Sequence, residues 1–301
     1  MRTAGQMEPG RSPWSRWRGA AMAVAAFVLL VVLWELVKLV VPADGVSIGG
    51  VRVLPRTSDA AMPHVWTVLG TLFDPEVAGA AQQRSVGAAV LSGALFTLRL
   101  SLGGLLLGGV LGVLLALLMQ RSGLLERALL PYIVASQTVP LIAIAPLVAG
   151  WGGKIAVFGQ PWQPWASVMV IAAYLAFFPI AVGMLRGLTS PRAEDVELFR
   201  ALACGWWTTL IRLRLPASVP FLIPAARLGA AAAVIGAIVA EISTGTRGGV
   251  GRLIIEYAQA ATGDPSRMYT AILGAAVLGL VAAGAVGLLD LTLRRYQAVA
   301  R

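Results

Sequence analysis

The chain has 301 residues, of which 58% are hydrophobic and only 13% are charged, with a mean hydropathy of +0.80. A water-soluble domain cannot bury that much apolar surface, so the lipid bilayer is expected to be the solvent for most of the chain. The net charge of +10 is not a sign of nucleic-acid binding, because the arginines cluster at the ends of apolar runs. The single cysteine (Cys204) and single histidine (His64) exclude an internal disulfide and a Cys/His metal site, so no metal is expected.

The chain begins with an arginine-bearing tail, residues 1–18, followed by an apolar run over residues 19–41. This run is long enough to cross roughly 30 Å of hydrocarbon as a helix. A signal peptide is the alternative, but its apolar region would be only about 7–15 residues long. We therefore expect an uncleaved first transmembrane helix. Residues 42–94 are polar and rich in glycine and proline, which predicts an extracytoplasmic loop with one short helix around residues 65–73.

The second apolar run, residues 95–119, carries Gly104, Gly108 and Gly112 at four-residue spacing. Such spacing clears one face of a helix for close approach of another backbone. We therefore expect this face to pack against a neighbouring span.

The third run, residues 128–151, contains Pro131, Pro140 and Pro146. Backbone carbonyls freed by proline at membrane depth are tolerated where protein or a water-filled cavity satisfies them. The run predicts a bent helix, either beside a pathway or simply kinked where it packs. Further spans are expected at residues 166–185, 219–242 and 269–291, the last followed by a tail over residues 292–301.

The basic residues indicate how six such spans are oriented. Placing both termini in the cytoplasm gives the inner segments twice as many Lys and Arg residues as the outer ones, as the positive-inside rule requires. The inner set is Arg2, Arg11, Arg16, Arg18, Arg121, Arg127, Arg186, Arg192, Arg200, Arg212, Arg214, Arg294, Arg295 and Arg301, and the outer set is Arg52, Arg56, Arg84, Lys154, Arg247, Arg252 and Arg267. We predict a multi-pass protein of the cell membrane with residues 186–217 on the cytoplasmic side.

The most polar part of this inner segment, residues 195–213, has the composition of one amphipathic helix. Its apolar positions include two adjacent tryptophans, Trp206 and Trp207, with arginines at other positions. An amphipathic helix lying on the inner leaflet has the same composition as a helix that docks on a partner protein. The residues alone leave both interpretations open.

The order of residues in the segment resembles the EAA loop of binding-protein-dependent ABC importer permeases. Glu197 stands at the acidic position, Ala203 at the glycine position and Leu215-Pro216 at the closing pair. The chain departs from the pattern because Leu198 and Phe199 replace two alanines and the nearest glycine, Gly205, comes two residues late. Alanine tolerates a left-handed backbone poorly compared with glycine, which puts the geometry of this turn in question.

The likeness extends from about residue 19 to the end and is greatest to permeases of the nitrate, sulfonate and taurine type. The motifs that carry it are Leu54-Pro55, Phe96 to Arg99, Pro140 to Pro146, Phe178-Pro179, and Ala240-Glu241 followed by Gly249-Val250-Gly251. It implies an all-α protein with the type I permease core over residues 95–291. It also implies a cytoplasmic coupling loop at residues 186–217.

In that family the loop docks on a cytoplasmic ATPase, and the resemblance implies two further partners, a second permease chain and an extracytoplasmic solute-binding protein. The positions that the likeness assigns to ATPase coupling are Glu197, Arg200, Ala203, Gly205, Trp206, Trp207, Leu215 and Pro216. The chain has no phosphate-binding loop of its own, because Gly152-Gly153-Lys154-Ile155 lacks the required hydroxyl. We therefore expect no cofactor on this chain, no enzymatic activity, and ATP hydrolysis on a separate subunit.

Polar groups inside apolar runs are candidates for the translocation path, because such groups usually pair or face a cavity. Ser136, Gln137 and Thr138 are candidates in the third span, and Arg99 and Glu241 are candidates near the outer ends of their spans, where snorkelling to the interface is the alternative. Two further ionisable residues, Glu35 and Lys38, are three apart on one helix and are expected to pair with each other.

Two other classes of protein compete with this interpretation. A secondary carrier without an ATPase would need inverted repeats and charges at mid-membrane, and no repeat is recognisable. An intramembrane enzyme would need a nucleophile with its base, which one histidine and one cysteine in separate segments do not supply. The substrate cannot be read from the sequence, and the resemblance implies only a small polar or anionic solute, with pyrimidine or flavin precursors served by the same kind of permease.

Overall fold

The computed structural model describes residues 13–48, 51–76, 84–157, 159–260 and 264–297. Most of these residues are helical, which confirms the all-α class. The strands form two short antiparallel hairpins: β1 (Val46–Ile48) with β2 (Val51–Leu54), and β3 (Ala156–Val157) with β4 (Gln160–Pro161).

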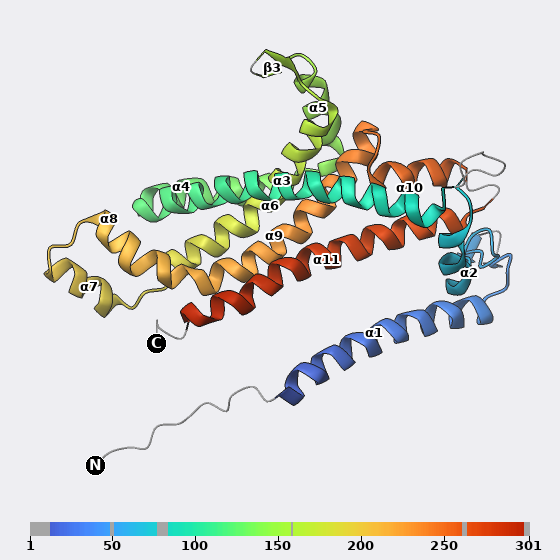
Figure 1. Cartoon of the computed structure of the whole chain (residues 1–301), viewed down its shortest axis with the longest axis horizontal. Helices are drawn as coiled ribbons and strands as arrows, with labels where there is room; N and C mark the ends of the chain where they lie inside the picture. The colour runs from blue at the N-terminus through green and yellow to red at the C-terminus, as the bar shows by residue number, and fades with distance from the viewer. Residues whose placement is uncertain (1–12, 49–50, 77–83, 158, 261–263, 298–301) are drawn as a thin grey trace.

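The long helices α3 (Val86–Arg121), α6 (Pro164–Leu188), α9 (Leu215–Thr244) and α11 (Ser266–Gln297) lie side by side along the long axis of the molecule (Figure 1). Within the described residues, 4 helical segments are long and apolar enough to cross a membrane, or up to 5 if one bent pair counts as a span. These segments coincide with the five expected spans of the core. The first expected span coincides with α1 (Pro13–Val40), which is not among the 4 segments and whose crossing of the membrane stays a prediction.

Helix α3 begins earlier than the sequence indicated, at Val86 instead of residue 95. Its N-cap is Ser85, whose side chain accepts a hydrogen bond from the Ala88 N–H at 3.2 Å. A serine in this position satisfies an N–H group that the first turn of a helix leaves free, so the helix starts there. Residues 86–94, expected to be loop, are therefore helix.

The third expected span is broken, not gently bent. Helix α4 (Gly123–Ser136) and helix α5 (Leu141–Gly152) meet at an angle of 97°. Pro140 stands at the break with an extended backbone (φ −60°, ψ 115°). Proline lacks the N–H that would continue α4, so the first helix ends before it. Helix α5 consequently leaves the bundle sideways and carries the β3–β4 hairpin away from it (Figure 1).

Small residues bring α3 and α6 into backbone contact. A Cβ atom added at Gly104, Gly108 or Gly112 would lie 2.4, 2.5 or 2.7 Å from atoms of α6. This confirms that the glycine face of α3 packs against a neighbouring span. Helices α6 and α9 approach equally closely, since a Cβ at Gly187 would lie 2.6 Å from the Cα of Ser218. In a membrane such close packing replaces the hydrophobic effect as the source of helix association.

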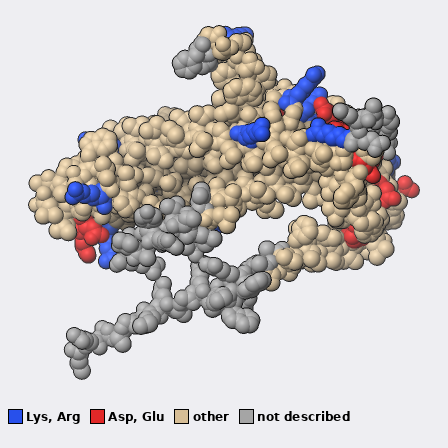
Figure 2. Space-filling model, in the orientation of Figure 1, with Lys and Arg blue, Asp and Glu red and all other residues tan. Residues whose placement is uncertain are grey.

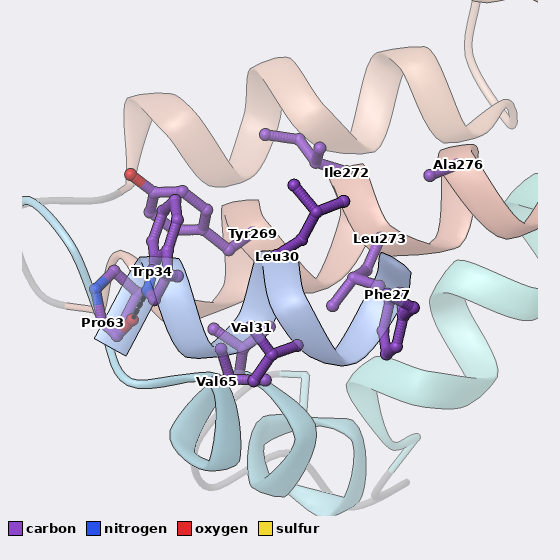
Figure 3. A pocket seen from close by; sticks show the side chains of 11 residues that line it. Phe27, Leu30, Val31, Trp34, Pro63, Val65, Tyr269, Ile272, Leu273 and Ala276 are labelled. Atoms are coloured by element: carbon purple, nitrogen blue, oxygen red, sulfur yellow. Dashed lines mark hydrogen bonds between the residues drawn. The ribbon is translucent and has the colours of Figure 1, made fainter. Parts of the chain in front are cut away.

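The C-terminal part of helix α1 contacts the bundle. The Trp34 indole N–H donates to the Pro63 carbonyl at 3.1 Å, and its ring lies edge-on to Tyr269 of α11 at 5.8 Å. Next to this contact, α1, α11 and the short helix α2 (Val65–Gly70) border an apolar groove of about 260 Å³, and Trp34 and Tyr269 line one end of it (Figure 3). Phe27 and Leu30 of α1 line one wall of the groove and Ile272 of α11 lines the other.

The expected pairing of Glu35 with Lys38 is wrong. Glu35 contacts His64 Nδ1 at 2.7 Å and accepts from the Val65 N–H at 3.0 Å, whereas Lys38 donates to Asp59. The reason is that the segment after α1 folds back and offers each side chain a closer partner than its neighbour on the helix. The Lys38 ammonium, through its hydrogen bond and its charge, holds the pKa of the Asp59 carboxyl below its usual value. These four side chains form a latch, called here the α1 latch.

Candidate functional site

Most charged side chains on the visible face lie toward the two ends of the molecule, and the surface between them carries only a few basic side chains (Figure 2). One end carries the segment between α6 and α9 and is called here the loop end. The other carries α2 and α10 (Val250–Gln259) and is called the α10 end (Figure 1). This distribution fits a bundle whose middle lies in hydrocarbon.

The loop that the resemblance assigns to coupling is not one helix over residues 195–213, as the sequence suggested. Helix α7 (Ala193–Ala201) ends early, and a separate helical stretch starts at Trp206. That stretch comprises α8 (Trp206–Thr209) and a π-helical turn η2 (Leu210–Arg214), and it continues into α9. The two tryptophans therefore lie just before α9, at the N-terminal end of a membrane span, and not on α7.

The break follows from a left-handed residue at Ala203, whose φ is 53°. The Cys204 N–H donates to the Phe199 carbonyl and the Ala203 N–H donates to the Arg200 carbonyl, both at 2.9 Å. These two bonds make a Schellman motif, the turn that ends many helices and usually has glycine in the left-handed position. The glycine position of the EAA pattern thus marks a real backbone requirement, and this chain meets it with alanine at a cost in strain.

Helix α7 presents its side chains to solvent. Glu197 and Arg200 are exposed, and none of the nine residues of α7 is buried. Leu198 is 56% exposed, and Leu202 in the following turn is 66% exposed. Large apolar side chains so exposed next to charged ones are typical of an interaction surface.

The two tryptophans differ in their surroundings. Trp206 packs against the buried cluster at the loop end, and the Arg121 guanidinium lies 5.4 Å from the centre of its ring. Trp207 stands edge-on to Trp206 at 4.6 Å but is 67% exposed. Sequence reasoning treated the pair as equivalent, and only the packing separates a structural tryptophan from an exposed one.

The closing pair of the motif, Leu215 and Pro216, starts α9. Pro216 follows directly on the π-helical turn η2, so its missing N–H falls where the hydrogen bonding changes from the π to the α pattern. The preceding residue, Arg214, donates from Nη1 to the Leu188 carbonyl at the end of α6 at 2.9 Å. This hydrogen bond connects the N-terminal end of α9 directly to the C-terminal end of α6.

The three polar candidates of the third span form the turn between α4 and α5. Ser136 Oγ donates to the Ile133 carbonyl at 2.7 Å, and Thr138 Oγ1 donates to the Ala135 carbonyl at 2.8 Å. Gln137 Nε2 donates to Ser136 Oγ at 3.3 Å, and Tyr174 of α6 donates to the Ser136 carbonyl. These side chains therefore complete the hydrogen bonds of a broken helix, and their place on a path stays a prediction.

The other two path candidates lie in opposite environments. Arg99 is exposed on α3, whereas Glu241 of α9 is fully buried with an exposed fraction of 0%. The carboxyl of Glu241 is held by Thr97 and by the start of α10. The sequence analysis did not select Thr97 as a partner of Glu241. Two sequence features pointed toward this contact: Thr97 stands two residues before Arg99 in the Phe96–Arg99 motif, and Gly249-Val250-Gly251 follows Glu241.

Within the described part of the chain, no group of three His, Cys, Asp or Glu side chains could hold a metal ion. What the two ends offer instead are an exposed helix with apolar side chains beside it and a buried hydrogen-bonded junction. This arrangement defines a polytopic helical membrane protein with an exposed loop at one end.

Comparison with known proteins gives the class a family. The family model described as binding-protein-dependent transport system inner membrane component matches residues 108–295. The chain belongs to this family, which confirms the resemblance drawn from its motifs.

Two relatives show where the chain stands within this family. It is 39% identical over 138 residues to the formylaminopyrimidine transport permease protein ThiX of Halalkalibacterium halodurans, a match covering 46% of this chain and 52% of that protein. It is 29% identical over 194 residues to the putative aliphatic sulfonates transport permease protein SsuC of Bacillus subtilis, covering 64% of this chain and 66% of that protein. The matches therefore span between half and two thirds of these relatives.

Among solved structures, a crystal structure of an amino acid ABC transporter with histidines shares the fold. The TM-score is 0.52 at 19% identity, and the match covers 69% of this chain and 94% of that chain. The shared fold is the type I permease core that the motifs implied.

Proposed function

We propose that this chain is the membrane-spanning permease subunit of an ABC importer of the cell membrane, with both termini in the cytoplasm. It forms the path for a small polar or anionic solute that an external binding protein delivers. ATP is hydrolysed on separate cytoplasmic subunits, and two permease chains, identical or homologous, form the bundle. Family membership and the names of the relatives support this proposal.

The single observation that carries it is the loop end. Exposed α7 is joined by a Schellman turn to Trp207 and then, without interruption, to α9. A partner that binds α7 and Trp207 would therefore act directly on a membrane span. Tryptophan and arginine are the residues that dominate many protein interfaces, because they bury large areas or form forked hydrogen bonds.

The mechanism that follows is mechanical. Closure of two ATPase subunits on ATP would move α7 together with the N-terminal end of α9, because α8 and η2 connect them. Helix α6 would follow, since Arg214 binds the Leu188 carbonyl at its end. Two packed spans would then shift as rigid elements between inward- and outward-facing states. The solute class is carried over from the relatives, whose names refer to formylaminopyrimidine and aliphatic sulfonates.

The test is association with the ATPase expected to be encoded beside this chain. Trp207→Ala should weaken co-purification by about thirtyfold, which corresponds to about 2 kcal/mol for an interface residue of this type. Glu197→Lys should weaken it as well by reversing the charge of α7. Both side chains are exposed in the free permease, so membrane insertion and thermal stability should not change.

Two matched substitutions make the result specific. Leu280→Ala removes an apolar side chain that is 74% exposed on α11 and should leave the ATPase bound. Trp206→Ala should lower the stability of the permease itself, because Trp206 packs in the cluster at the loop end. An ATPase that stays bound to the Trp207→Ala and Glu197→Lys variants contradicts the docking assignment. An ATPase that does not bind the unchanged permease favours the alternative, a secondary carrier without an ATPase.

A further inference from the structure

The α10 end contains a buried carboxyl group that joins three helices. Glu241, in the last turn of α9, accepts from Thr97 Oγ1 of α3 at 2.8 Å (Oε1) and 3.0 Å (Oε2). Its Oε2 also accepts from the Gly251 N–H of α10 at 2.9 Å. Among the described residues, these hydrogen-bond partners are all uncharged, so the carboxyl is not one half of an ion pair.

Thr97 completes the junction from the side of α3. Its Oγ1 accepts from the Val250 N–H at 3.0 Å and lies 3.0 Å from the Gly93 carbonyl. A hydroxyl has one proton to donate, and here that proton is shared between the carboxyl of Glu241 and the Gly93 carbonyl. The first two N–H groups of α10, which a helix start normally leaves free, are therefore bonded to side chains of α3 and α9.

Glycines let the backbones close around this carboxyl. A Cβ atom added at Gly249 would lie 2.1 Å from Glu241, and one at Gly251 would lie 2.6 Å from the Ile238 carbonyl. On α3, a Cβ at Gly93 would lie 3.2 Å from the Val250 nitrogen. The junction thus depends on a carboxyl, a hydroxyl and small residues from three helices, and we call it the α10 junction.

We propose that Glu241 and Thr97 are positioning residues for transport: they bind α10 to the ends of α3 and α9 so that the α10 end moves as one rigid body. The inference rests on the proposed function, because a transport cycle requires this end to move. Neither side chain needs to touch the solute in this role. A buried polar group costs free energy unless its hydrogen bonds are complete, so the junction tolerates one arrangement and resists partial opening.

A distance measurement tests this directly. In full-length protein with Cys204→Ser, reconstituted in nanodiscs with its ATPase, spin labels are placed at Leu91 of α3 and Glu256 of α10, both of which are exposed. The distance distribution should be narrow and the same without nucleotide and with ATP plus vanadate. Thr97→Val, which has the same shape without the hydroxyl, should broaden it about twofold as α10 opens locally.

Conservative variants separate hydrogen bonding from mere packing. Thr97→Ser keeps the hydroxyl, and Glu241→Gln offers an acceptor to Gly251 and a donor to Thr97, so both should retain the narrow distribution. Glu241→Leu should broaden it as Thr97→Val does. If Glu241→Leu fails to insert in the membrane, the Thr97 pair alone decides.

Two results would overturn the inference. A narrow distribution in Thr97→Val means that the hydroxyl holds nothing, and a wild-type distribution that changes with ATP means that α10 moves independently of α3. The nucleotide-free measurement needs no ATPase. Failure of the ATPase to bind, which would sink the proposed function, is therefore distinguishable from failure of the junction.

Discussion

The two ends of this molecule differ in whether their side chains find partners within the chain. At the α10 end, three helices meet around Glu241, and the polar atoms of the junction find partners within the chain. At the loop end, α7 buries none of its residues and Trp207 stays largely exposed. Both ends use a special backbone position, glycine at the first and a left-handed alanine at the second. A junction that is complete in itself is suited to rigidity, whereas one that leaves apolar side chains in water is suited to a partner.

The largest expected effect comes from breaking the closed end. Gly249→Val places a side chain where the carboxyl of Glu241 lies, and it should lower the free energy of unfolding by about 3 kcal/mol, the upper range for overpacking. Unfolding by titration with SDS measures this. Gly279→Val on α11 is the matched control, because no heavy atom lies within 4 Å of its added Cβ. Equal stability of the two variants would show that the close approach is not needed.

An intermediate effect should come from relaxing the open end. Ala203→Gly removes the strain of a left-handed alanine, about 1–2 kcal/mol, but gives flexibility to the unfolded chain. The net gain in free energy of unfolding should be about 0.5–1 kcal/mol. The control Ala201→Gly, in helical backbone two residues earlier, should lose about 1 kcal/mol. Differential scanning fluorimetry in detergent compares the two, and a loss of stability in both variants would contradict the geometry of the turn.

The smallest effect concerns the α1 latch, which is neither a closed junction nor an open surface. Asp59→Asn should widen the distance between spin labels at Leu30 and Ile272, which face each other across the groove (Figure 3). Lowering the pH should do the same. The pKa of Asp59 is lower in the folded protein, so its contribution is present above the unfolded value near 4 and is lost as pH falls through the folded value.

A control and a contrary outcome complete this test. Asp74→Asn changes a carboxyl outside the latch and should leave the distance unchanged. If neither Asp59→Asn nor low pH changes the distance from its wild-type value at neutral pH, Trp34 and His64 hold α1 without the Lys38–Asp59 pair. Exposed ion pairs are usually weak, so the expected change is small.

Local patterns were enough to predict much of the core. The spacing of Gly104, Gly108 and Gly112 predicted a packed helix face, and the EAA pattern marked Ala203 as a turn position although the composition suggested one helix across it. They were not enough to predict the break at Pro140, since the same prolines fit a kinked helix and a broken one. Nor could they separate Trp206 from Trp207, because adjacent residues with identical side chains differ only in what packs against them.

Composition, the spacing of apolar runs and the order of a few motifs determined by themselves that this is a helical membrane protein of one transport family. These features follow from the solvent and from local backbone rules, which act on neighbouring residues. The tertiary structure alone decided that Glu241 meets Thr97, 144 residues away, and that Glu35 contacts His64 instead of Lys38. Such contacts depend on how distant segments fold against each other, and a buried side chain takes whichever partner that folding brings within hydrogen-bond distance.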